Sequence, residues 1–130
     1  MTSRICEVII DSHQPLELAR WWAEALDYRL HPPAAAGWVT IAPWASAAER
    51  PSEEAMIRAP QVPAIVFVPV PEAKLVKNRV HLDLWAIDRS QDEEVASLLA
   101  RGATRVDVGQ HDVPWQVLAD PEGNEFCVLG

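Results

Sequence analysis

The feature that most constrains the fold is a repeated order of short strand patterns and amphipathic helix patterns. An apolar strand pattern is followed by residues at helical spacing and then by three more strand patterns, and the second half repeats this order. Glu7 on the first strand lies 20 residues before Asp27, where the first helix is expected to end. His81 lies 21 residues before Gly102, where the second helix is expected to end. The sequence therefore predicts two βαβββ modules that share a pattern but no residue-level repeat.

We expect the modules to span about 1–69 and 78–130 and to form a single domain over residues 1–130. The predicted fold class is α+β, with two antiparallel sheets forming a concave pocket and one helix packed on each sheet. A hollow of this kind is a natural site for a small molecule.

The individual elements follow from periodicity and from turn residues. Strands are expected at 5–11, 28–31, 38–42, 64–68, 79–86, 104–108, 114–119 and 125–129. Helices are expected at 15–26 and 90–101, and Ser90 with Glu93 three residues later forms a capping box. The Asp-Pro-Glu-Gly segment at 120–123 is typical of a turn. The segment 43–63, rich in Ala, Pro, Ser and Glu, is expected to be a long loop or a partly helical excursion.

The net charge and the distribution of apolar residues limit the classes of partner that we expect this protein to bind. The net charge of -8 at pH 7 disfavours nucleic acid and anionic membranes, which attract basic surfaces. No run approaches the roughly 20 apolar residues that a membrane helix needs, and the first apolar run ends at Asp11, too early for a signal peptide. The two cysteines are expected as free thiols, with Cys6 against the helix and Cys127 facing the pocket. We therefore expect a cytoplasmic protein.

The segment 79–84 carries a histidine and a carboxylate on one face of a strand. Its apolar residues alternate with polar ones, so Leu82 and its apolar neighbours on either side, Val80 and Leu84, would face a packed layer. His81 and Asp83 would face the other way, into a pocket. Asp83 has two readings of equal weight, because it could orient His81 or form an ion pair with Arg79.

Glu7 and the tryptophans point to the same pocket. A carboxylate between Val and Ile residues is costly unless it faces a polar cavity, so Glu7 is expected to line one. An indole offers a flat apolar face and one donor, which suits a pocket wall, and the candidates are Trp38, Trp85 and Trp115. A short basic cluster of Lys74, Lys77 and Arg79 could contact an anion at the pocket mouth.

Several of these segments together resemble a known family. The segments 77–84, 102–104 and 120–129, with the helix around Trp21 and Trp22, are similar to the small glyoxalase-like branch of the vicinal oxygen chelate superfamily. That superfamily includes glyoxalase I, extradiol dioxygenases and bleomycin resistance proteins. The resemblance covers essentially the whole chain except 43–63.

The resemblance implies a metal position built from four strands. These positions are occupied here by Glu7, by Val66 or Val68, by His81 and by Cys127. Valine cannot coordinate a metal, so no metal cofactor is favoured. If an ion binds, the resemblance implies zinc, nickel or iron held by Glu7, His81 and Cys127. Otherwise Val66, Val68 and Cys127 are expected to line the pocket.

The resemblance implies a small-molecule pocket protein without a complete metal site, which binds or transforms a small oxygenated or aromatic metabolite. One alternative is a metal-dependent lyase or isomerase of glyoxalase type that uses Glu7 and His81. Another is a resistance-type protein that sequesters an antibiotic. If chemistry occurs, His81, Glu7 and Asp83 are the expected catalytic residues. The resemblance also implies a homodimer, and the sequence leaves open whether the protein is an enzyme.

Overall fold

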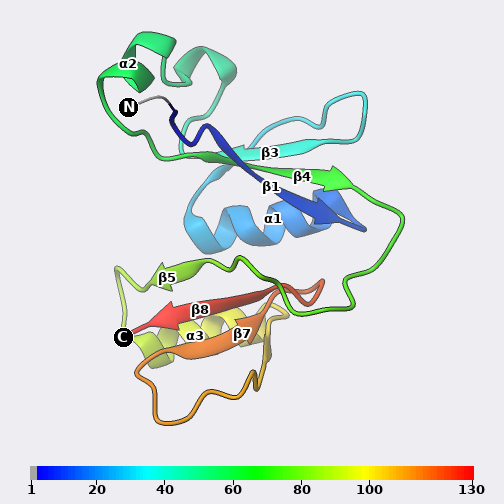
Figure 1. Cartoon of the computed structure of the whole chain (residues 1–130), viewed down its shortest axis with the longest axis vertical. Helices are drawn as coiled ribbons and strands as arrows, with labels where there is room; N and C mark the ends of the chain where they lie inside the picture. The colour runs from blue at the N-terminus through cyan, green and yellow to red at the C-terminus, as the bar shows by residue number, and fades with distance from the viewer. Residues whose placement is uncertain (1–2) are drawn as a thin grey trace. The chain divides into compact units, whose positions relative to one another are not determined.

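Each half of the chain forms its own four-stranded sheet in the computed structural model, which describes residues 3–130 (Figure 1). The first unit runs to Glu72, and the second unit comprises Ala73–Gly130. Within residues 3–130, no helix is both long enough and apolar enough to cross a membrane. The cytoplasmic location and the homodimer stay predictions.

The first unit follows the predicted order of elements, with two short helices inserted before its last strand. Its sheet has the strand order β1-β4-β3-β2, in which β1 is parallel to β4 and the other pairs are antiparallel. The elements are β1 (Glu7–Ser12), α1 (Pro15–Leu26), β2 (Arg29–Leu30), β3 (Val39–Ala42), the 3-10 helix η1 (Ala47–Glu49), α2 (Glu53–Arg58) and β4 (Ala64–Pro69).

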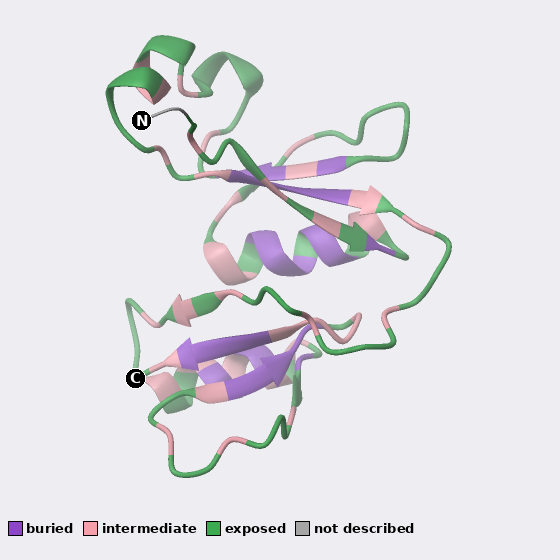
Figure 2. Ribbon diagram, in the orientation of Figure 1, coloured by how far each residue is buried: buried purple, intermediate pink, exposed green. Residues whose placement is uncertain are grey.

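The core of the first unit lies between α1 and the sheet. Pro15 begins α1 with a preset φ, and Asp27 ends it in the left-handed conformation. Leu18 and Trp22 of α1 are buried, as are Ile41 on β3 and Phe67 on β4, two of the strands that α1 contacts. Figure 2 shows the same division, with buried residues on α1 and the central strands and exposed residues on α2. Burial of this apolar stripe is what holds α1 in place.

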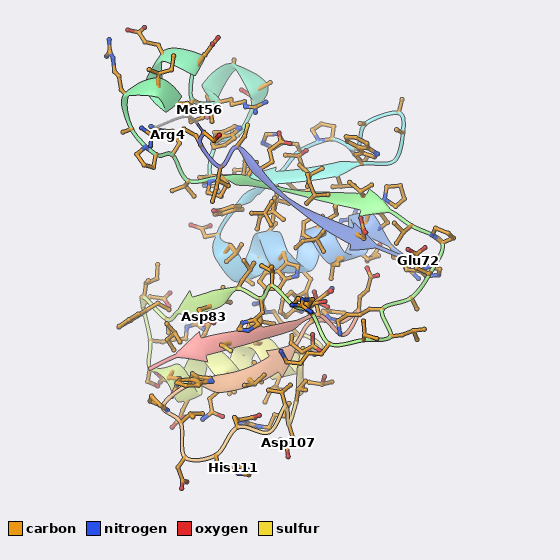
Figure 3. All side chains as sticks on the ribbon, viewed as in Figure 1. Arg4, Met56, Glu72, Asp83, Asp107 and His111 are labelled. Atoms are coloured by element: carbon orange, nitrogen blue, oxygen red, sulfur yellow. The ribbon has the colours of Figure 1, made fainter. Side chains whose placement is uncertain are left out.

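The helix α2 is attached to the first unit by the segment that precedes β1. The guanidinium of Arg4 donates hydrogen bonds to the carbonyl oxygens of Met56 at 3.0 Å and Ile57 at 3.4 Å (Figure 3). These acceptors belong to the last turn of α2, where carbonyl groups lack helical partners. The segment 43–63 is therefore the partly helical excursion that its composition allowed.

The second unit repeats the topology of the first. Its sheet has the order β5-β8-β7-β6, with β5 parallel to β8 and the other pairs antiparallel. The elements are β5 (Asp83–Trp85), α3 (Gln91–Ala100), β6 (Thr104–Arg105), β7 (Gln116–Ala119) and β8 (Glu125–Leu129). Val95 and Leu98 are the buried residues of α3, which packs on β8.

A compact turn joins β7 to β8 at the Asp-Pro-Glu-Gly segment. Asp120 is only 2% exposed, and its carboxylate accepts hydrogen bonds from the backbone N–H groups of Glu122 at 2.9 Å and Asn124 at 3.0 Å. Gly123 has a φ of +88°, which a residue with a side chain rarely adopts. The predicted turn is confirmed, and it sets the register in which β8 begins.

The duplicated α+β architecture is confirmed, and three details of the prediction are wrong. The sheets are mixed instead of antiparallel, because each module brings its fourth strand beside its first in the same direction. The strand expected at 79–86 is regular only over Asp83–Trp85, and Val80, expected in a packed layer, is 81% exposed. The strand expected at 104–108 ends at Arg105.

The capping box of α3 gives a test of local helix stability. The Ser90 hydroxyl accepts from the Glu93 N–H at 3.3 Å, and a Glu93 carboxylate oxygen accepts from the Ser90 N–H at 2.9 Å. We expect Ser90→Ala to lower the free energy of unfolding by about 1 kcal/mol. The matched control is Ser52→Ala, which removes the cap of α2. Because α2 contains no buried residue, its fraying should leave global urea unfolding almost unchanged. Equal losses in the two variants would contradict this.

Candidate functional site

The open face of the second sheet, the face away from α3, carries the candidate site. Asp83 on β5 lies opposite Cys127 on β8, and Val117 on β7 lies opposite Cys127 from the other side. Because strand residues alternate between faces, these three side chains share the open face, while Phe126 and Leu118 point toward α3. Figure 3 labels Asp83 at the start of β5. The strand pairing thus sets a carboxylate, a thiol and an apolar side chain in one row.

A cavity of about 380 Å³ lies on this face and is lined by residues of the second unit. Its polar lining consists of Lys77, His81, Asp83, Gln110, Glu125 and Cys127. Its apolar lining includes Trp115, Val117 and Val108. The cavity therefore combines an aromatic and aliphatic wall with six groups that can bind polar atoms.

His81, Asp83 and Cys127 form the tightest polar cluster in the cavity. One potential ligand atom of each side chain lies within 4.8 Å of the other two. His81 Nδ1 is 3.8 Å from Asp83 Oδ1, and the two side chains are 41% and 52% exposed. This distance is longer than a hydrogen bond, and among residues 3–130 no ion pair joins Asp83 to Arg79, so the role of Asp83 in orienting His81 stays a prediction.

The Cys127 thiol is held in its protonated form. Burial raises its pKa most, the negative charge of Asp83 raises it further, and the S–H group donates a hydrogen bond to that carboxylate. Lys77 acts in the opposite direction, but the pKa remains above the usual value for cysteine. A thiol in this state is a poor nucleophile by itself.

A second polar cluster fixes the segment that leads into the cavity. Glu125 accepts from the Lys74 ammonium at 2.8 Å and from the Asn78 N–H at 2.9 Å. Asn78 also donates from its side chain to Asn124 at 3.2 Å. Burial opposes ionisation of Glu125, but the hydrogen bonds from Lys74 and Asn78 outweigh it and lower the pKa of the carboxyl group. These contacts hold both ends of 74–78 and place Lys77 at the cavity.

Glu7, the expected partner of His81, lies in the first unit. It is on β1 with a partly exposed side chain, and its carboxylate is 3.5 Å from Arg50. The same guanidinium donates to Cys6 Sγ at 2.9 Å. Both cysteines are free thiols as predicted, but Cys6 is exposed and not packed on the helix, because it precedes the regular part of β1. The pairing of Glu7 with His81 stays a prediction.

The other predicted pocket residues divide between the units. Trp115 and Cys127 line the cavity of the second unit, whereas Trp85 and Arg79 are exposed residues outside its lining. Val66, Val68 and Trp38 belong to the first unit. Val66 and Val68 lie in register with Ile9 and Asp11 of β1, and Trp38 is 50% exposed.

The four-strand metal position implied by the resemblance does not fit these side chains. Val66 and Val68 carry no donor atom, and the first-strand carboxylate is already paired with Arg50. Cys127 replaces a hard oxygen or nitrogen ligand with a buried protonated thiol. The set of donor atoms therefore differs at more than one position from the set that the resemblance implies.

Several cavity residues were missed by the sequence analysis. Gln110 and Val108 enter the lining because the chain turns sharply after β6. Asp107 accepts from the Gly109 N–H at 2.8 Å, and Gly109 has a φ of +90°. An Asp-x-Gly segment is typical of such a turn, so the signal was present in the sequence. Glu125 was placed on a strand but not in the cavity.

The chain is similar to a known domain family and to solved structures of the same fold. A family model described as a glyoxalase-like domain matches residues 7–129. A genomically encoded fosfomycin resistance protein from Listeria monocytogenes has a TM-score of 0.65 at 9% identity, covering 99% of this chain and 91% of that chain. A glyoxalase/bleomycin resistance protein/dioxygenase family enzyme from Burkholderia phytofirmans has a TM-score of 0.62 at 13% identity, covering 97% of each chain. A glyoxalase/bleomycin resistance protein from Albidiferax ferrireducens has a TM-score of 0.54 at 19% identity, covering 96% of each chain. No match was found among curated proteins.

The Glu125 cluster predicts a pH dependence of stability. Because the folded-state pKa of Glu125 is lowered, its contribution is present above the unfolded-state pKa and is lost as pH falls through the folded-state value. We expect Glu125→Gln to be less stable than the wild type at pH 7, with a difference that shrinks in acid. Thermal unfolding between neutral and acidic pH measures this. The control Glu72→Gln removes the same charge from an exposed position. A difference independent of pH would contradict the assignment.

Proposed function

Because the chain belongs to the glyoxalase-like domain family, whose model matches residues 7–129, we propose that the cavity on the second sheet binds a small oxygenated or aromatic molecule. The observation that carries the proposal is the lining itself, in which an indole and aliphatic groups lie beside six polar side chains. Binding sites for small molecules commonly combine apolar walls with a few polar groups that orient the ligand.

The size of the cavity supports a small ligand. Its volume of about 380 Å³ lies near the lower end of the roughly 300–1,000 Å³ that is usual for ligand pockets. Trp115 is 38% exposed, so part of its ring surface is available for stacking. A planar or compact molecule could cover this ring and the aliphatic side chain of Val117.

The charges in the cavity favour an oxygen-bearing ligand. Lys77 makes a long hydrogen bond of 3.4 Å to the Asn78 carbonyl oxygen, which a ligand oxygen could replace. Glu125 is neutralised by Lys74 at 2.8 Å, so it does not compete for Lys77. A carbonyl, hydroxyl or acidic oxygen near Lys77 and Gln110 would satisfy the polar side of the pocket.

Tryptophan fluorescence tests the proposal. We expect at least one compound in a panel of planar natural products and small oxygenated antibiotics, including fosfomycin, to quench the emission saturably. Trp115→Phe should remove most of the quenching, because the emitting ring that contacts the ligand is lost. Trp115→Ala should raise Kd about fivefold, the equivalent of roughly 1 kcal/mol for an aromatic contact.

Two other tryptophans serve as controls for this titration. Trp85→Phe changes an exposed residue of the same sheet outside the cavity lining, and its quenching should match the wild type. Trp38→Phe tests the first unit, where this residue was a predicted pocket wall. Quenching that depends on Trp38 and not on Trp115, or a flat response to the whole panel, would contradict the proposal.

A second candidate function is proton transfer by His81, in a lyase or isomerase. The observation that favours it is the distance of 3.8 Å between His81 Nδ1 and Asp83 Oδ1. Histidine is the side chain that most often acts as a general base, and a carboxylate beside the imidazole is a common companion of that role. A protein that only sequesters an antibiotic would have no need for this arrangement.

Hydrogen exchange distinguishes catalysis from binding. If His81 is a general base, the protein should accelerate solvent deuterium incorporation next to the carbonyl group of a pocket-bound compound, and His81→Gln should abolish the acceleration. NMR of the recovered compound measures the exchange. Glu7→Gln should leave it unchanged if His81 and Asp83 suffice, whereas loss in that variant would show that both units act together. Absence of exchange for every bound compound would favour sequestration.

A further inference from the structure

The loop 106–115 forms one wall of the cavity in the second unit. It runs from the end of β6 to the start of β7, and Figure 3 labels Asp107 and His111 on it. Val108 and Trp115 of this loop are partly exposed, so burial alone does not fix their side chains. Four residues of the loop line the cavity, namely Val108, Gly109, Gln110 and Trp115.

Gln110 holds the first half of this loop from within. Its amide oxygen accepts a hydrogen bond from the Val108 N–H at 2.7 Å, and its amide nitrogen donates to the Val106 carbonyl oxygen at 2.9 Å. The Val106 N–H in turn donates to the Val117 carbonyl oxygen at 3.2 Å, which ties this half of the loop to β7. The Gln110 side chain therefore connects the backbone of Val108 to the sheet.

Gln91 holds the second half of the loop from α3, and it lies outside the cavity lining. Its amide nitrogen donates to the carbonyl oxygens of Pro114 at 2.8 Å and of Val128 at 2.9 Å, which uses both of its N–H groups. Pro114 immediately precedes Trp115, and Val128 lies opposite Gln116 on the neighbouring strand. One side chain thus joins the backbone beside the indole to β8.

Gly130 leaves the room that this bridge occupies. A Cβ atom at Gly130 would lie 3.3 Å from Gln91 Oε1 and 3.3 Å from the Pro114 carbonyl oxygen. A glycine is suited to positions where other groups approach the backbone this closely. The Gln91 amide is therefore packed between Gly130 and Pro114 and does not extend into solvent.

We propose that Gln91 and Gln110 are positioning residues of the cavity, with Gln91 orienting Trp115 and Gln110 orienting Val108. An amide suits both places, because it donates and accepts hydrogen bonds without adding a charge beside the apolar wall. These roles rest on the proposed function, since a wall can orient a ligand only if the cavity binds one. Gln91 acts through Trp115 and does not touch the ligand itself.

Fluorine NMR of the full-length protein labelled with 5-fluorotryptophan tests the role of Gln91. Trp115→Phe identifies the Trp115 signal. Gln91→Glu keeps the size of the side chain and an acidic residue suits the first turn of a helix, but a carboxylate cannot donate to either carbonyl oxygen. The Trp115 signal should therefore shift or broaden.

The matched control is Gln61→Glu in the first unit. Gln61 also donates to two carbonyl oxygens, those of Ala55 at 3.3 Å and Ala59 at 3.2 Å, so the same chemical change is made away from the cavity. The Trp115 signal should match the wild type in this variant. A Trp115 signal that is unchanged in Gln91→Glu, or equally changed in Gln61→Glu, would overturn the role of Gln91.

Solvent exchange of the Val108 amide, measured by NMR, tests the role of Gln110. Gln110→Met removes the acceptor, so exchange should become about fivefold faster, as expected for the loss of one hydrogen bond. Gln110→Glu keeps an acceptor oxygen and should restore slow exchange. Equal exchange rates in the wild type and Gln110→Met would overturn this role.

Binding of 2-naphthol, a neutral planar probe, separates positioning from ligand binding. Equilibrium dialysis gives Kd without relying on the tryptophan signal. Gln91→Glu should raise Kd by up to the roughly fivefold expected for loss of the ring, and it should have no further effect in the Trp115→Ala background. An equal rise in both backgrounds would overturn the action of Gln91 through Trp115. Wild-type protein that binds no 2-naphthol while both NMR effects appear would support the two positions and count against the proposed function instead.

Discussion

The parallel pairing of β5 with β8 is the contact on which the candidate site depends. It places Asp83 beside Cys127 across a sequence separation that no local interaction spans, and the Cys127 N–H donates to the Leu82 carbonyl oxygen at 2.9 Å just before the regular strand begins. A slip of one residue would turn Asp83 toward α3 and leave the thiol without its neighbour. Since β5 is only three residues long, its register also relies on the Glu125 hydrogen bonds that hold the preceding segment.

The two units share a topology but differ in what their open faces carry. The first strand of each unit pairs in parallel with the fourth, so equivalent positions of the two sheets can be compared directly. In the first unit the fourth strand presents Val66, whereas the fourth strand of the second unit presents Cys127. At this position, therefore, only the second sheet carries a side chain with a donor atom. The two units thus share a topology but differ at this position, and the cavity described above is lined by residues of the second unit.

The strand β8 contributes side chains both to the core of the second unit and to the cavity. Phe126 and Val128 from this strand are buried in the core with α3, whereas Cys127 between them and Glu125 before them line the cavity. Glu125 binds Lys74 and Asn78 and so supports the segment that carries Lys77, while Cys127 lies among His81 and Asp83. Because successive residues of a strand face opposite ways, the same short segment anchors the core and builds the polar side of the pocket.

The sequence by itself determined the elements whose signals are local. The bounds of α1 and β8, the capping box of α3 and the turn before Glu125 all follow from residues within a few positions of each other. The tertiary structure decided what depends on distant partners: the parallel direction of β5 and β8, the short regular length of β5, and the entry of Gln110 into the cavity. It also decided that His81 is grouped with Asp83 and Cys127, because strand register is set by pairing across the sheet and not by the local pattern of either strand.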